Sequence, residues 1–273
     1  MTGPAADPTG NAVGAFLRAR REAVTPAAVG LPARARRRTP GLRRSELAEL
    51  AGVSVEYLTR LERGRDRRPS PQVLAALATA LRLTDDEHVH LIRLVKAVDG
   101  GACSVRAAAP LRPSLRALLD RLEPDPALLV DRIGTVLACT EGFRKLAGPL
   151  GLLDDGSVAR FVLVDPRART VFPEWDAVAE EWAVRLRTAA DLGDPRATAL
   201  ATELALTPGS GFVARYAAAT RVPRWSGTEL WSHPDRGDLH LAYEALEVPG
   251  GAEHRLLTYL PTPTPDPPRT TLS

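Results

Sequence analysis

The chain has 273 residues, enough for two domains that each bury a core, and no stretch approaches the 18 apolar residues that a membrane helix needs. No basic-then-apolar leader is present, so we expect a soluble, cytoplasmic protein with no membrane partner. Its two cysteines, Cys103 and Cys139, fit a reducing compartment and not a disulfide scaffold.

The net charge of +3 is distributed unevenly along the chain. Residues 1–70 contain 14 basic and 7 acidic side chains, whereas the remainder contains 22 basic and 26 acidic ones. Such a concentration of positive charge in one part of a chain is typical of a module that binds nucleic acid.

The first predicted elements are a loose segment, a helix and a basic connection. Residues 1–10 are rich in Gly, Pro and Thr and are predicted to be disordered, and a helix is expected over Val13–Ala23. The connection that follows, Val24–Pro40, contains four arginines and no acid: Arg34, Arg36, Arg37 and Arg38. We expect this cluster to contact phosphate or the minor groove of DNA, with a solvated surface cluster as the alternative.

Residues 42–65, LRRSELAELAGVSVEYLTRLERGR, are predicted to form two short helices around a tight corner. Gly52 can adopt the positive φ that such a corner needs, and Ser54 is a suitable N-cap for the second helix. Two helices joined in this way form a helix-turn-helix, whose second helix enters the major groove of double-stranded DNA.

The exposed residues early in the second helix are the candidates for base contacts: Val55, Glu56, Thr59 and Arg60. Arg60 can bind guanine through two hydrogen bonds, Glu56 can accept from cytosine, and Val55 or Thr59 can touch a thymine methyl group. Alternatively, Glu56 and Arg60 form a surface ion pair at i and i+4 spacing. Candidates for phosphate contacts lie at the ends of the two helices: Arg44, Ser45, Arg63 and Arg65.

Two more helices complete the first predicted domain, 11–98, and a linker follows it. The fourth helix is expected to start at Ser70-Pro71, and the fifth at Thr84, whose capping box includes Glu87. Residues 99–113 are rich in Gly, Ala and Pro and are predicted to be a linker.

The second predicted domain, 114–262, mixes strands and helices. Two strands are expected at Ala127–Asp131 and Thr135–Ala138, an amphipathic helix at Glu174–Ala190, and a hairpin of Leu239–Val248 with Arg255–Leu260. The fold class is therefore an all-α DNA-binding domain followed by an α+β domain, with a loose tail at 263–273.

The sequence offers no catalytic or metal-binding motif that favours an enzyme. It lacks H-E-x-x-H, paired C-x-x-C, a phosphate-binding glycine loop and G-x-S-x-G. His233, Asp235, Asp238 and His240 lie close together in sequence and could hold a metal, but we favour the interpretation that they flank a hairpin with turn-forming Asp and Gly residues. We therefore predict no catalytic residue, no metal and no cofactor.

Residues 42–65 resemble the Xre/Cro-type repressor family. Leu128-Leu129-Val130-Asp131, Leu163-Val164-Asp165-Pro166, Phe172-Pro173-Glu174-Trp175 and Ser232-His233-Pro234, in this order, resemble the MmyB-like ligand-binding domain of actinobacterial regulators. The resemblance implies a PAS-like sheet and a cavity that takes an apolar small ligand, with a fatty acyl chain as one candidate. Many relatives carry an aromatic-Asn pair where this chain has Cys139-Thr140, and this departure puts the polarity of the ligand in doubt.

Together these features predict a ligand-responsive transcriptional regulator, expected to act as a homodimer. We expect the ligand cavity to be lined by one helix and the facing strands: Val130, Val136, Trp175, Trp182, Leu241 and Tyr243. Two alternatives stay open, namely a second domain that serves only dimerisation, and an enzyme domain fused to a DNA anchor.

Overall fold

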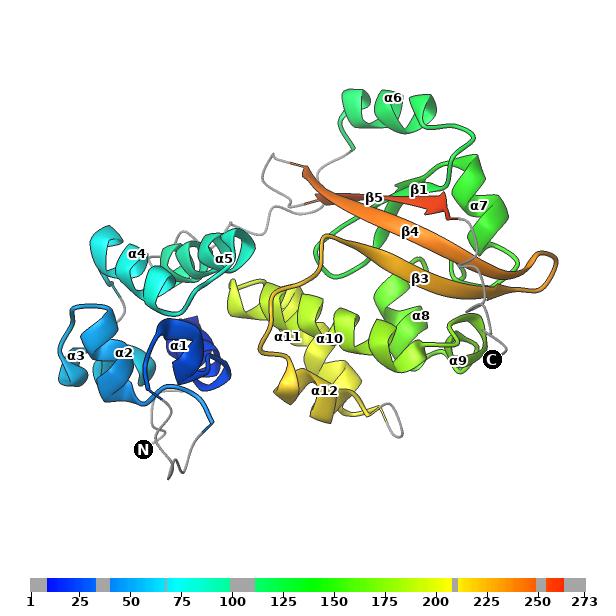
Figure 1. Ribbon diagram of the computed structural model, residues 1–273. Helices are drawn as coiled ribbons and strands as arrows, with labels where there is room; N and C mark the ends of the chain where they lie inside the picture. Colours follow the sequence, from blue (N-terminus) through cyan, green and yellow to red (C-terminus); the bar gives the residue numbers. More distant parts are fainter. Residues whose placement is uncertain are drawn as a thin grey trace, which may run out of the picture. The chain divides into compact units, whose positions relative to one another are not determined.

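The computed structural model describes residues 9–32, 40–66, 68–98, 111–207, 211–248 and 254–262. The chain forms two compact units (Figure 1). The first comprises residues 1–104 with the short stretches 190–195 and 220–222, and the second comprises the rest. Within the described ranges, no helix is long and apolar enough to cross a membrane.

The first unit is helical, as its sequence predicts (Figure 1), but its first helix begins at Thr9 and not at Val13, within the segment that was expected to be disordered. Its elements are α1 (Thr9–Ala23), the 3-10 helix η1 (Pro26–Val29), α2 (Arg44–Leu50), α3 (Val55–Glu62), α4 (Pro71–Ala80) and α5 (Asp85–Lys96). Leucines from all five α-helices are fully buried in one core: Leu17, Leu47, Leu58, Leu77 and Leu91.

The ends of these helices follow local capping rules. Ser70 Oγ accepts from the N–H of Val73 (3.3 Å), and Pro71 occupies the first turn of α4. Thr84 and Glu87 form the expected capping box, in which each side chain accepts from the backbone N–H of the other (3.3 and 3.0 Å). The predicted starts of α4 and α5 are therefore confirmed.

The second unit contains seven helices and five strands in its described part (Figure 1). The helices are α6 (Pro113–Arg121), α7 (Glu141–Ala147), α8 (Val158–Val164), α9 (Ala168–Val171), α10 (Trp175–Asp191), α11 (Pro195–Ala205) and α12 (Phe212–Ala218). The strands are β1 (Ala127–Val130), β2 (Val136–Cys139), β3 (Ser226–His233), β4 (Gly237–Val248) and β5 (His254–Pro261).

The strands form one antiparallel sheet in the order β2-β1-β5-β4-β3. Alternate residues of β1 and β5 point to opposite faces. Leu128, Val130 and Leu257 pack in the main core with residues of helices α7 to α11, while Leu129 and Leu256 pack with Leu119 of α6 in a smaller cluster. The α+β class predicted for this unit is confirmed.

Sequence analysis did not predict strand β3. Its sequence, SGTELWSH, lacks a regular apolar alternation, and His233 was assigned to the flank of a hairpin. In the structure β3 pairs along its whole length with β4, from Ser226 opposite Glu244 to His233 opposite Gly237. This strand therefore depends on its neighbour in the sheet for its conformation, not on its own pattern.

Candidate DNA-binding surface and ligand cavity

The corner between α2 and α3 has the geometry of a helix-turn-helix. Gly52 adopts a φ of +63°, and the N–H of Val53 donates to the carbonyl of Ala48 (2.9 Å). Ser54 Oγ accepts from the N–H of Tyr57 (3.0 Å) and caps α3. Both roles predicted for Gly52 and Ser54 are confirmed.

Three of the four residues predicted to contact bases are exposed on α3: Val55, Glu56 and Arg60. Thr59 is partly buried, and its hydroxyl donates to the carbonyl of Val55 one turn earlier (2.7 Å). The Thr59 hydroxyl is therefore occupied in the free protein, which leaves its methyl group as the simpler contact for a base.

Arg60 forms its ion pair with Asp66 and not with Glu56. The Arg60–Asp66 separation is 3.8 Å, the Arg60 side chain is 51% exposed, and its guanidinium lies 5.5 Å from the centre of the Tyr57 ring. An exposed pair of this length contributes little to stability. Arg60 can thus leave it for a base at small cost.

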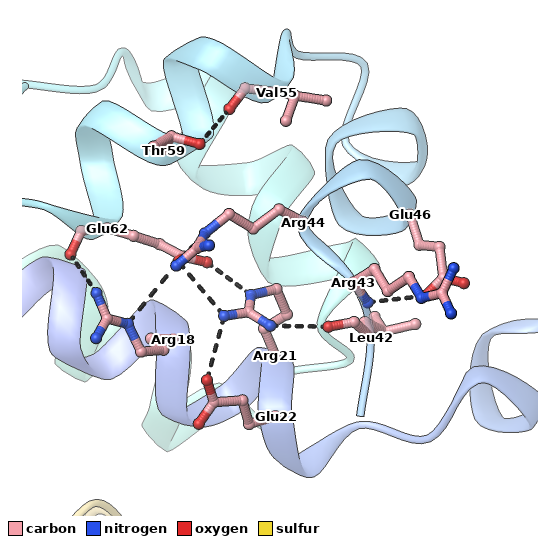
Figure 2. Close-up of polar contacts among 10 residues, drawn as sticks. All are labelled: Arg18, Arg21, Glu22, Leu42, Arg43, Arg44, Glu46, Val55, Thr59 and Glu62. Atoms are coloured by element: carbon pink, nitrogen blue, oxygen red, sulfur yellow. Dashed lines mark hydrogen bonds and ion pairs between the residues drawn. The ribbon is translucent and has the colours of Figure 1, made fainter. Parts of the chain in front are cut away.

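A buried carboxylate, Glu62, holds together three arginines at the base of the motif (Figure 2). Arg21 Nε donates to Glu62 Oε1 (2.6 Å), and Arg44 Nε donates to Glu62 Oε2 (2.7 Å). Arg18 lies 3.9 Å from the same carboxylate, and Arg21 Nη1 donates to the carbonyl of Leu42 (2.8 Å). Glu62 therefore ties α1, the start of α2 and the end of α3 to one another.

Close backbone packing places α1 beside Glu62. A Cβ atom on Gly14 would lie 2.5 Å from the carbonyl oxygen of Glu62, and one on Gly41 would lie 2.3 Å from that of Glu22. Glycine is therefore required at both positions, because a side chain at either one would displace the neighbouring backbone.

The predicted phosphate contacts fall into three groups. Ser45, Arg63 and Arg65 are exposed at the ends of the motif helices. Arg44 is 40% exposed and bound to Glu62 through Nε, which fixes the direction of its guanidinium. The arginine cluster lies outside the described residues: Arg34, Arg36, Arg37 and Arg38. The DNA contacts of all three groups remain predictions.

The main core of the second unit contains a small cavity of about 10 Å³, close to the space of one water molecule. Its lining is apolar and aromatic apart from one carboxylate, Glu229. Val130, Val178, Trp182, Trp231 and Tyr259 are among its walls. We call this space the inner cavity.

A larger cleft of about 90 Å³ lies between α10 and the β3–β4 hairpin. Its walls come from Glu174, Ala177, Val178 and Glu181 on the helix side and from Arg224, Gly227, Thr228, Glu229, Leu230 and Tyr243 on the other. Val178 and Glu229 line both the cleft and the inner cavity, so these two side chains separate them.

Burial shifts the pKa values of the ionisable groups where the cleft meets the inner cavity. It raises the pKa of the Glu229 carboxyl, while the hydrogen bond from Trp231 Nε1 (2.8 Å) acts in the opposite direction. Burial also raises the pKa of the Tyr243 hydroxyl, and it raises that of the Tyr259 hydroxyl well above its ordinary value, with Glu229 adding to the latter effect.

The predicted pocket residues are divided between these spaces and the surrounding core. Val130 and Trp182 line the inner cavity, and Tyr243 lines the cleft. Trp175 donates from Nε1 to the carbonyl of Val162 (2.8 Å), and Val136 and Leu241 pack in the same core without lining either space. Ligand contact remains a prediction for all six.

Thr140, which stands where many relatives carry Asn, has a structural role. Its buried hydroxyl accepts from the N–H of Phe143 (3.1 Å) and of Ala127 (2.9 Å) and donates to the carbonyl of Asp125 (2.8 Å). It thereby caps α7 and ties it to β1. Neither Cys139 nor Thr140 lines the inner cavity or the cleft.

The histidines around the β3–β4 turn do not form a metal centre. Within the described ranges, no group of three or more His, Cys, Asp or Glu side chains is placed to hold a metal ion. His233 Nδ1 accepts from the N–H of Asp235 (3.1 Å), which is a turn contact. The assignment of these residues to a hairpin flank accounts for their geometry better than shared ligation.

Sequence reasoning missed Glu62 and Glu229. Glu62 is 41 positions from Arg21, so no local rule connects them. Glu229 is an acid in a strand without a clear pattern, and its environment comes from α10 and β5. The alternation of Glu229, Trp231 and His233 along one face was the available sign that this segment has a buried side.

A helix-turn-helix with an exposed second helix, followed by an α+β domain with an apolar cavity, defines a DNA-binding transcription regulator with a ligand-binding domain. Residues 12–91 match a helix-turn-helix domain family. Residues 111–272 match the MmyB-like transcription regulator ligand binding domain, and the chain belongs to this family. Neither is an enzyme family. A comparison with curated proteins gave no match.

Proposed function

We propose that this regulator reads a specific DNA sequence through α3 and that an apolar small molecule in its C-terminal domain changes its affinity for DNA. It acts by binding rather than by catalysis, in the cytoplasm where its DNA target lies, and as a homodimer on two half-sites. The observation that carries the ligand part is the pair of adjoining spaces, the cleft and the inner cavity, which share Val178 and Glu229.

The DNA part rests on exposure and freedom of the candidate side chains. Val55, Glu56 and Arg60 extend from the first two turns of α3, and Arg60 is held by weak contacts, a long exposed pair with Asp66 and the face of the Tyr57 ring. The ion pair of Glu62 with Arg21 anchors the end of α3 to α1. A rigid helix that presents unrestrained base-reading side chains is well suited to the major groove.

The ligand part requires the second unit to open. The inner cavity of about 10 Å³ holds no more than a water molecule, whereas the cleft of about 90 Å³ adjoins it across Val178. An apolar chain that enters through the cleft must therefore displace core side chains. This displacement is what allows binding to alter the shape of the domain.

Selection of binding sites from random DNA with the full-length protein tests the DNA part. We expect one enriched sequence with two inverted half-sites, because a homodimer places two copies of α3 on neighbouring major grooves. Enrichment of a single half-site would contradict the dimer, and absence of any enriched sequence would contradict specific reading.

A second candidate function is dimerisation by the C-terminal domain without ligand sensing. The nearly filled core favours it, and so do Leu246 and Leu260, which are 52% and 53% exposed. Native mass spectrometry of gently purified protein separates the candidates. A co-purifying small molecule supports sensing, whereas a dimer that carries none supports dimerisation alone.

A further inference from the structure

Among the described residues, the boundary between the cleft and the inner cavity carries a single ionisable side chain. Glu229 lies on β3, two residues before Trp231, so both side chains point to the face of the sheet that α10 covers. The other walls of the inner cavity are aliphatic or aromatic. A ligand that passes from the cleft into the core must therefore pass this carboxylate.

The other charged residues around the cleft are Glu181, Glu174 and Arg224, and of these Glu181 is bound to buried partners. Glu181 is buried and accepts from Arg185 Nε (3.2 Å) and from the backbone N–H of Arg224 (2.8 Å). The Arg185 Nη2 group donates to the carbonyl of Arg224 (3.1 Å). Glu174 and the Arg224 side chain are exposed at the rim. Glu181 is thus satisfied by its partners.

Glu229 differs from Glu181 in its partner. The group that donates to it in the described structure is the indole N–H of Trp231, which is neutral, and Arg185 acts on it only at longer range. A carboxylate at an apolar wall loses hydration without gaining a cation in contact. In the described structure, the Glu229 carboxylate therefore lacks a cation in direct contact.

We propose that the cleft takes a cationic amphiphile, an apolar body with a protonated amine that pairs with Glu229. The apolar part extends past Val178 into the core, and the amine stays at the junction within reach of Glu229, with Glu174 at the rim. This inference rests on the proposed ligand-sensing function and specifies the chemical class of its ligand.

A carboxylate headgroup fits this junction poorly. It would bring a third acidic group next to Glu229 and Glu174 in a partly enclosed space, where Coulomb interactions are stronger than in water. The Arg224 side chain that also lines the cleft is exposed, so solvent screens its attraction for such a headgroup. The free fatty acid that the family resemblance suggests is therefore disfavoured at this position relative to an amine with the same chain.

The test is the binding of three probes with one apolar chain, hexylamine, hexan-1-ol and hexanoate, to the full-length protein at pH 7 by calorimetry. We expect the amine to bind tightest and the acid weakest, with roughly a tenfold difference between them, which corresponds to about 1.4 kcal/mol. Ala177→Trp, which fills the cleft from its helix side, should abolish binding of the amine. Ala199→Trp, at an exposed position of α11, is the matched control.

The charge is tested by Glu229→Gln, which keeps an acceptor for Trp231. This variant should bind the amine about tenfold more weakly and the acid more tightly, while Glu180→Gln, exposed on α10, should change neither. If Glu229→Gln does not fold, the order of the three probes on the unmodified protein decides the question.

The outcomes separate the two proposals. If the alcohol and the acid bind as tightly as the amine, and Ala177→Trp still blocks them, apolar ligand sensing stands and the cationic inference is wrong. If no probe binds, or Ala177→Trp leaves binding unchanged, the cleft is not the ligand site and both proposals fail.

Discussion

At the scale of single residues, Arg60 is the side chain on which specific reading depends most. Its ion pair with Asp66 spans 3.8 Å and half of its side chain is exposed, so little stability is lost when it turns to a base. Replacing Arg60 with Ala should cost roughly 1–3 kcal/mol on the cognate site and relax the preference at one base position.

Fluorescence anisotropy with the cognate duplex and its single-base variants measures this effect. Arg63→Ala serves as the comparison, because the loss of a phosphate contact weakens binding to all sequences equally. A uniform loss for Arg60→Ala as well would show that Arg60 touches phosphate and not a base.

His90 makes the stability of the first unit depend on pH. Burial, with Arg93 and Arg20 adding to it, lowers the pKa of His90 from 6.5 to about 4, and the ring packs against Phe16 at 5.1 Å. Below pH 6.5, His90 takes up a proton in the unfolded chain, whereas in the folded chain it stays neutral until the pH falls to about 4. The stabilising contribution is therefore complete above pH 6.5 and is lost as the pH falls through this window.

Urea unfolding between pH 4.5 and 7.5 tests this. The full difference of about 2.5 pKa units corresponds to roughly 3 kcal/mol. His90→Gln should show a shallower decline of the unfolding free energy on acidification than the unmodified chain, whereas His88→Gln on the same helix should keep it. Equal slopes for all three proteins would refute the role of His90.

At the scale of elements, the Glu62 cluster fixes how α1, α2 and α3 meet. Removing Glu62 leaves the buried Arg21 guanidinium with the more exposed Glu22 carboxylate (3.3 Å) in place of its buried partner, and breaking a buried pair in this way costs about 3–5 kcal/mol. Glu62→Ala should therefore lower the free energy of unfolding by that amount, and Glu56→Ala on the exposed side of α3 should change it by less than about 0.5 kcal/mol. Comparable effects of the two substitutions in urea would contradict the proposed importance of the cluster.

Sequence analysis predicted those helices and turns whose conformation depends on residues only a few positions away in the sequence. The N-caps at Ser54 and Thr84 and the positive φ of Gly52 depend on neighbours no more than four positions away. Strand β3 and the Glu62 cluster could not be predicted in this way, because partners distant in the sequence determine them.

The candidate ligand site shows the same limit. The apolar pattern of α10 predicted that Trp182 faces inward, and it lines the inner cavity. The same pattern could not predict that Trp175 is engaged by the Val162 carbonyl instead. Nor could it predict that Glu229 stands at the junction of two spaces, because this position results from the packing of α10 against β3 and β5.

At the scale of the whole molecule, the central claim is that ligand binding in the second unit changes DNA affinity in the first. A ligand has this effect only if it binds the DNA-competent and DNA-incompetent arrangements unequally. A tenfold change in DNA affinity needs about 1.4 kcal/mol of such difference, and the coupling must be reciprocal.

The most direct test titrates the selected DNA site with the full-length protein, with and without the small molecule that co-purifies or the tightest-binding probe. We predict a change in DNA affinity of about tenfold that disappears in Ala177→Trp and persists in Ala199→Trp, with equal affinities of all three proteins in the absence of ligand. A DNA affinity that stays the same at saturating ligand would contradict the account.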